Sequence, residues 1–134
     1  MNRKEYREAA FSLLFSYDFR SDEIPEDFYI SYLSENEIKD DLYLKKVFFG
    51  VINQKEKIDD IISKNLSNWN IQRLSKVTLV ILRLAIYEMS ECDDIPFVVS
   101  INEAVELAKK FDEQSSSKFV NGILNSAAAS LGLK

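Results

Sequence analysis

Apolar residues recur at helical spacing along almost the whole chain. The first predicted helix begins near Asn2, because Asn2 and Glu5 have the spacing of a capping box. At about 100° per residue, one face of this helix is apolar. That face is formed by Tyr6, Ala10, Leu13, Leu14 and Tyr17. We expect it to pack against the core.

A second apolar stripe lies roughly on the opposite side of the same helix. It consists of Phe11, Phe15 and Phe19. A helix at the edge of a bundle needs only one buried stripe. These three rings must therefore meet either another helix of the fold or a partner molecule.

The middle of the chain predicts shorter elements. Residues 21–37 are acidic and contain Pro25, which predicts a loop and a short helix. A long helical stretch runs from about Ile38 to Leu66, and its apolar stripe rotates beyond Gly50, where we expect a bend. The segment from Trp69 to Leu74 predicts a connector with a short helix.

The helix that follows is apolar nearly all round, which is typical of a helix in the middle of a bundle. Its sequence is KVTLVILRLAIYEMS, preceded by Ser75 as the expected cap and ended by Asp93 and Pro96. Arg83 lies within it and must be paired if it is buried. We expect the partner to be Glu103 or an acid of another helix.

Two further helices complete the pattern. In VSINEAVELAKKF, Glu106 and Lys110 stand four residues apart and are expected to pair on the exposed face. The serine run at 115–117 predicts the cap of a last helix. Its inward residues are Val120, Ile123, Leu124, Ala127 and Leu131. The predicted fold is all-α: a compact bundle of six to seven helices in one domain, residues 1–134.

Composition supports a helical bundle and argues against an enzyme. Three Gly and two Pro are too few for the tight turns of a β-sandwich or barrel. The chain has no His, the commonest general base, and a single Cys92 allows neither a disulfide nor a zinc site. No glycine-rich phosphate-binding motif is present. We therefore expect a binding module without cofactor or metal.

The sequence does not predict a membrane protein. The N-terminus has no apolar signal core. The longest apolar stretch, near Val77 to Ile86, contains Thr78 and Arg83 and is too short to span a bilayer. Together with the single cysteine, this predicts a cytoplasmic protein.

The net charge of −5 is unfavourable for binding nucleic acid, but the charges are segregated along the chain. Residues 43–87 carry eight basic and three acidic residues. Beyond residue 113 there are two lysines and no acid. Local basic patches can therefore persist on an acidic protein.

Two patches are candidates for RNA contact. Arg3, Lys4 and Arg7 share an arc of about 100° at the start of the first helix, where the helix dipole disfavours cations. Phosphate contact would explain them, and a solvated basic tip is the alternative. Phe119 flanks the apolar stripe of the last helix and Lys118 points nearly away from the core, so the ring could stack on a base beside a phosphate-binding lysine. The alternative is that Phe119 plugs the end of the bundle.

The chain resembles the NusB family. The resemblance rests on LRLAIYEM (82–89), DIPFVVSINEAVELAKKF (94–111) and KFVNGIL (118–124), in this order and spacing. The segment REAAFSLLFSYDF (7–19) also looks like the first helix of the family. The resemblance covers most of the chain outside residues 21–68.

This resemblance implies two small helical subdomains and a function in transcription antitermination. Family members bind the boxA element of nascent ribosomal RNA transcripts together with a small-subunit ribosomal protein, NusE, and help RNA polymerase to read through terminators. By position, the resemblance implies RNA contacts at Arg3, Lys4, Arg7, Ser115, Lys118 and Phe119. It implies contacts with NusE at Phe15, Phe19, Gln72 and Thr78.

Two positions depart from the family pattern. Thr78 stands where some members have an acid that pairs with a base of NusE, and Ser115 stands where an Asp is often found. Two other classes of function are alternatives. One is an RNA-independent protein-interaction module or homodimer built on the phenylalanine stripe, and the other is an accessory domain detached from an RNA methyltransferase. The missing catalytic groups argue against the second.

Overall fold

The computed structural model describes residues 1–67 and 70–134, and in this part of the chain every regular element is helical. The elements are α1 (Arg3–Asp18), α2 (Pro25–Glu35), α3 (Leu42–Asn53), α4 (Lys55–Lys64), the 3-10 turn η1 (Ile71–Arg73), α5 (Lys76–Glu91), α6 (Phe97–Phe111) and α7 (Ser116–Ser130). The predicted all-α fold is confirmed.

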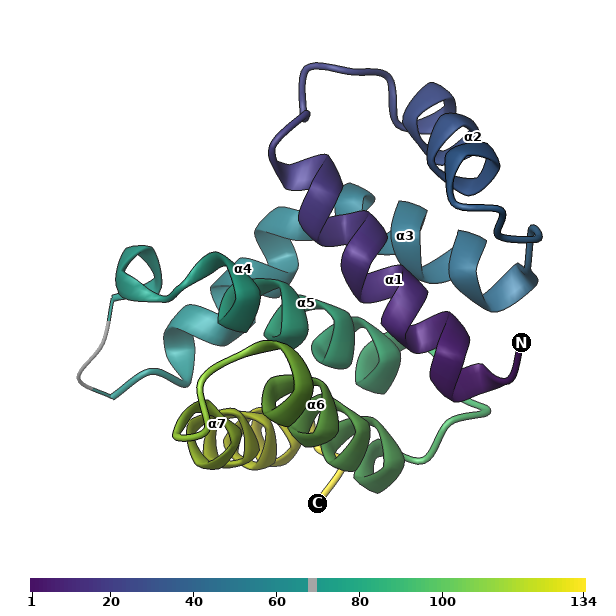
Figure 1. Cartoon of the computed structure of the whole chain (residues 1–134). Helices are drawn as coiled ribbons and strands as arrows, with labels where there is room; N and C mark the ends of the chain where they lie inside the picture. Colours follow the sequence, from purple (N-terminus) through teal and green to yellow (C-terminus); the bar gives the residue numbers. More distant parts are fainter. Residues whose placement is uncertain (68–69) are drawn as a thin grey trace.

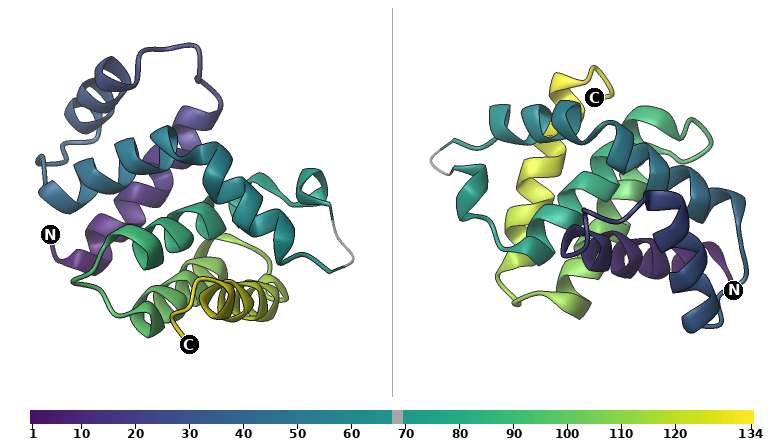
Figure 2. Two further views of the ribbon diagram at one scale, coloured as in Figure 1. Left: turned by 180° about the vertical axis from the view of Figure 1, so that it is seen from behind. Right: turned by 90° about the horizontal axis from the view of Figure 1, so that it is seen from above.

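Helix α5 is the centre of the molecule (Figure 1). Every residue from Thr78 to Met89 is buried, as its apolar sequence predicts. Helices α1 and α3 pack on one side of α5, and α6 and α7 pack on the other, which is also visible from behind in Figure 2. Helix α2 packs on α1 at the outside. One cluster of buried apolar side chains joins all seven α-helices of the described residues.

The predicted long helix at 38–66 is two helices. Helix α3 begins only at Leu42, because the side chain of Asp41 accepts a hydrogen bond from the Leu44 N–H and caps it there. The expected bend beyond Gly50 is a break at Gln54, which separates α3 from α4. In the predicted connector, η1 supplies the short helix, and Trp69 lies outside the described residues.

Helix caps agree with the sequence at two of three predicted starts. The capping box of Asn2 and Glu5 forms with both hydrogen bonds at 2.9 Å, and Ser75 caps α5 through the Thr78 N–H. The serine run does not cap α7 in the expected way. The side chain of Ser115 accepts no capping hydrogen bond, and the hydroxyl of Ser117 donates to the carbonyl of Gln114 instead.

Of the two predicted ion pairs, that of Arg83 is confirmed in its second alternative and that of Glu106 is wrong. Arg83 is buried and pairs with Asp59 of α4 at 2.8 Å and with Asp18 of α1 at 3.6 Å, rather than with Glu103. Its partner is thus an acid of another helix, the second of the two expectations. Glu106 pairs with Lys109 one residue earlier than predicted, at 3.3 Å. Lys110 instead reaches Glu8 of α1 and ties α6 to α1.

Candidate nucleic-acid interface

The three basic residues at the start of α1 do not share one environment. Arg3 and Lys4 are exposed, whereas Arg7 is only 4% exposed. The Arg7 guanidinium contacts both carboxylate oxygens of Glu88, at 2.8 and 3.1 Å, and Glu103 at 3.4 Å. This geometry does not fit the prediction that Arg7 contacts phosphate, because its hydrogen bonds are already made inside the protein.

Glu88 is 1% exposed and receives hydrogen bonds from three other helices. Besides Arg7 of α1, the hydroxyls of Tyr43 of α3 and Ser100 of α6 donate to its carboxylate. Burial acts to lower the pKa of the Arg7 guanidinium, but the hydrogen bond and charge of Glu88 raise that pKa above its ordinary value. This network fixes the N-terminal turns of α1 against the core.

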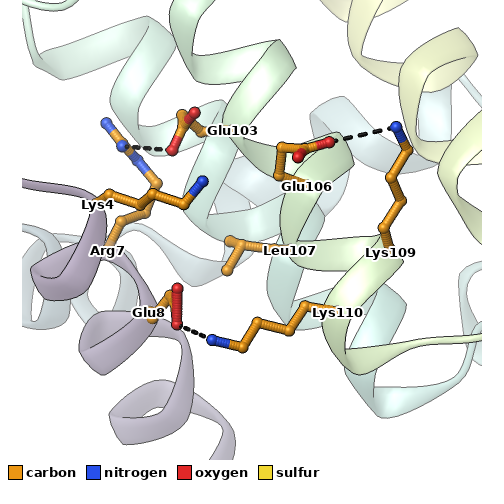
Figure 3. Close-up of a pocket in the computed structure, with 8 residues that line it drawn as sticks. All are labelled: Lys4, Arg7, Glu8, Glu103, Glu106, Leu107, Lys109 and Lys110. Atoms are coloured by element: carbon orange, nitrogen blue, oxygen red, sulfur yellow. Dashed lines mark hydrogen bonds and ion pairs between the residues drawn. The ribbon is translucent and has the colours of Figure 1, made fainter.

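A groove of about 280 Å³ runs between α1 and α6, with its lining drawn in Figure 3. It is lined by Lys4, Arg7, Glu8, Glu103, Glu106, Leu107, Lys109 and Lys110. Most of these charges neutralise one another across or along the groove. Lys4 forms no ion pair with any described residue, so its ammonium is available at the rim.

A second hollow, of about 350 Å³, lies where α5 and α7 begin. It brings Ser115 and Phe119, predicted to contact RNA, next to Thr78, predicted to contact NusE. Thr78 is buried, and its hydroxyl donates a hydrogen bond to the carboxylate of Asp112. A direct partner contact by Thr78 does not fit this burial, and Asp112 supplies the acid at this place.

Phe119 lies between that hollow and a wider one. It packs partly against the core, in agreement with the plug alternative, and it also lines both hollows. The wider hollow, about 540 Å³ between α4 and α7, includes Lys64 and Lys118. Lys118 is exposed, as the sequence predicts. An aromatic ring thus stands beside two lysines on one surface.

The phenylalanine stripe of α1 is partly covered by α6. The ring of Phe11 is buried and stacks on Phe111 at 5.0 Å between ring centroids. Phe15 is half-buried, and Phe19 is 66% exposed. A shallow cavity of about 330 Å³ opens beside this stripe, lined by Phe11, Ser12, Phe15, Ser16, Val77 and Phe111. One end of the stripe therefore meets a helix of the fold, and the other faces solvent.

Gln72, the fourth predicted contact with NusE, lies in η1 and is exposed. Its backbone N–H is held by the side chain of Asn70. It does not line the phenylalanine cavity. Gln72 is thus accessible on a different element from Phe15 and Phe19.

The predicted RNA contacts form two groups at the two ends of α6. Arg3 and Lys4 lie at the start of α1, whereas Ser115, Lys118 and Phe119 follow the end of α6. Lys109 and Lys110 in the last turn of α6 also line the groove beside Lys4, where they pair with Glu106 and Glu8. Their signal in the sequence was a pair of adjacent lysines near the end of the predicted helix VSINEAVELAKKF.

Comparison with known proteins decides the family. A model of the NusB family matches residues 4–129. The chain belongs to the NusB family. The match includes every predicted site residue except Arg3.

NusB relatives are similar over nearly their whole length. The transcription antitermination protein NusB of Clostridium botulinum is 46% identical over 128 residues, which cover 93% of this chain and 96% of that protein. The structure of T. maritima NusB matches with a TM-score of 0.84 and 39% identity, over 96% of this chain and 92% of that one. A crystal structure of antitermination factors NusB and NusE in complex with dsRNA matches with a TM-score of 0.84 and 32% identity, over 96% of each chain.

No described helix is long and apolar enough to cross a membrane. Within residues 1–67 and 70–134, no three His, Cys, Asp or Glu side chains are grouped to hold a metal ion. Cys92 is buried, and burial raises the pKa of its thiol, which keeps it in the less reactive protonated form.

Proposed function

We propose that this chain is a transcription antitermination factor that binds boxA RNA of nascent ribosomal RNA transcripts together with NusE. In this proposal it helps RNA polymerase to read through terminators in the cytoplasm, and it binds without catalysing a reaction. The observation that carries the proposal is the fold-wide match to NusB proteins, one of which was solved with NusE and dsRNA.

The RNA surface in this proposal runs along α6. Arg3 and Lys4 would contact phosphates at one end, and Lys118 would do so at the other. Phe119 would stack on a base, with the hydroxyl of Ser115 beside it. Arg7 would take no direct part, because Glu88 and Glu103 occupy its guanidinium; it would hold the start of α1 in place.

The surface for NusE is the open part of the phenylalanine stripe. Phe15, Phe19 and the cavity beside Val77 offer an apolar contact. The exposed Gln72 lies in η1, shortly before α5 begins. Asp112, rather than the buried Thr78, would pair with a base of NusE. A basic partner would also offset the net charge of −5 and strengthen RNA binding by the complex.

A second candidate function is a protein-interaction module or homodimer that does not bind RNA. The high exposure of Phe19 favours it, because an exposed ring beside an apolar cavity is typical of an interaction surface. Such a module would bind NusE, or a second copy of itself, with little dependence on salt.

Fluorescence anisotropy of a labelled boxA RNA separates the two functions. The RNA is titrated with the chain alone and with the chain plus NusE, at roughly 50 and 200 mM salt. Binding that tightens with NusE and weakens at high salt supports the proposed function. A salt-insensitive complex with NusE that leaves the RNA free would contradict it and favour the second candidate.

A further inference from the structure

The aromatic ring of Tyr43 carries the guanidinium of Arg3 on its face. The carbon centre of the Arg3 guanidinium lies 4.6 Å from the ring centroid, and that of Arg7 lies 5.6 Å away. These two cations come from α1, whereas Tyr43 belongs to α3. A cation in such a position is attracted by the electrons of the ring.

Tyr43 is itself held rigidly. It is 8% exposed, and its hydroxyl donates to the buried carboxylate of Glu88, which also binds Arg7 and Ser100. Burial raises the pKa of Tyr43, and the charge of Glu88 acts in the same direction, so the hydroxyl remains a donor. The ring therefore has one orientation.

Arg3 has little else to fix its position. Its side chain is 46% exposed, and its one ion pair, with Asp94, is long at 3.8 Å and solvent-exposed. An exposed pair of this kind contributes little. A guanidinium that stacks on a ring keeps its N–H edges directed outward, where they can bind a phosphate.

We infer that Tyr43 is a positioning residue for RNA binding: its ring holds the guanidinium of Arg3 at the RNA surface, with N–H groups presented to a phosphate. This inference rests on the proposed function. It extends the RNA site to α3, which supplies none of the contacts predicted from the sequence.

A double-mutant cycle on labelled boxA RNA tests the inference. Tyr43→Leu removes the ring and is expected to weaken RNA binding about two- to fivefold, the range of an exposed cation–π contact. Tyr43→Phe keeps the ring and loses only the hydroxyl, so it is expected to bind RNA within about twofold of the unmodified chain. In an Arg3→Ala background, Tyr43→Leu should have no further effect on RNA binding, because the exposed guanidinium that the ring positions is absent and Arg7 stays paired with Glu88.

A second readout shows the position of Arg3 without RNA. Ring current from Tyr43 should shift the NMR signal of the Arg3 side-chain N–H, and the shift should persist in Tyr43→Phe and vanish in Tyr43→Leu. An equal loss of RNA affinity from Tyr43→Leu with and without Arg3 would overturn the inference, since the ring would then act through the fold. No RNA binding by the unmodified chain would instead overturn the proposed function.

Discussion

Glu88 lies in the largely apolar helix α5 and accepts hydrogen bonds from three other helices. Its carboxylate binds the buried guanidinium of Arg7, and it also accepts from Tyr43 and Ser100. Two charges taken out of water are stable only as a complete pair with its hydrogen bonds. The position of the whole basic end of α1 therefore depends on one acid of α5.

Glu88→Gln removes the negative charge and leaves Arg7 with the weaker contact to Glu103. We expect the free energy of unfolding to fall by about 3–5 kcal/mol, the usual loss when one partner of a buried pair is removed. Urea denaturation measures it. The matched control is Glu106→Gln, whose pair with Lys109 is exposed and should change stability by less than about 1 kcal/mol. Equal effects of the two variants would contradict the assigned role of Glu88.

Ser115 is an exposed residue in the hollow that contains Phe119. Ser115→Asp would place a negative charge where RNA phosphate is proposed to approach, so we expect RNA affinity to fall about three- to tenfold at low salt. The control Ser34→Asp adds the same charge at an exposed position of α2 and should have little effect on RNA affinity. Unchanged affinity in Ser115→Asp would remove Ser115 from the RNA surface.

For single residues, the sequence identified candidate binding contacts but did not show which of them are buried. Arg7 stands at the helical spacing of Ala10, Phe11 and Leu14, all of which are buried, so its place on the core face was detectable. The spacing does not reveal that Glu88, 81 positions away, supplies the counter-charge. That pairing depends on how α1 crosses α5.

Helices α3 and α5 approach closely at Gly50. A Cβ built on Gly50 would lie 2.1 Å from the buried ring of Tyr87, so only glycine fits there. Gly122 of α7 has no described atom within 4 Å of such a Cβ. The two glycines share helical surroundings but differ in the space beside them.

Gly50→Ala should destabilise the protein by about 1–3 kcal/mol, because overpacking outweighs the gain in helix propensity. Gly122→Ala is the matched control and should stabilise it by about 0.5–1 kcal/mol. Thermal unfolding compares them. If Gly50→Ala were as stable as Gly122→Ala, the close packing of α3 on α5 would be wrong.

Asp18 ties the end of α1 to α4 and α5. Its carboxylate pairs with Lys76, Lys55 and Arg83. Burial acts to raise the pKa of Asp18, but the hydrogen bond to Lys76 and the charges of Lys55, Lys76 and Arg83 together lower it. A carboxyl with a lowered pKa in the folded state stabilises the fold above its ordinary pKa of 3.8.

Asp18→Asn should therefore cost stability at pH 6, by about 1–3 kcal/mol, the value of hydrogen bonds to a charged group. The difference between the unmodified chain and Asp18→Asn should shrink as the pH falls through the folded-state pKa of Asp18, below 3.8. Denaturant titrations between pH 3 and pH 6 (about one unit apart) measure this difference. A constant difference over the range would mean that the ion pairs do not stabilise the fold.

Most elements were predictable because periodicity and caps are local signals. Asn2 with Glu5 and Ser75 marked two helix starts correctly. The break at Gln54 was located only approximately, since neither Gly nor Pro stands there and the change of packing face decides it. The start of α7 at the serine run was predicted correctly, but its capping hydrogen bond was not. Ser115 is the N-cap residue without a side-chain bond, because serines can bond to several nearby backbone groups and the fold selects among them.

On the scale of the whole molecule, the two proposed surfaces share helices α1 and α6 but use different residues of them. The phenylalanine surface belongs to α1 where it meets α5 and α6, and the proposed RNA surface follows α6 from the start of α1 to the start of α7. The sequence predicted most of these residues singly. Which residues belong to which surface depends on tertiary packing. The same packing buries Arg7 and Thr78, which the sequence had suggested as contacts.

Phe15→Ser tests most directly whether these surfaces are separate but coupled. The measurement is the affinity of labelled boxA RNA for the Phe15→Ser chain, with and without NusE, compared with the unmodified chain. We predict that the RNA affinity of the chain alone stays within about twofold while the enhancement by NusE is lost, because Phe15 belongs to the surface proposed for NusE and not to the one proposed for RNA. Retained enhancement, or an equal loss of RNA affinity without NusE, would contradict the account.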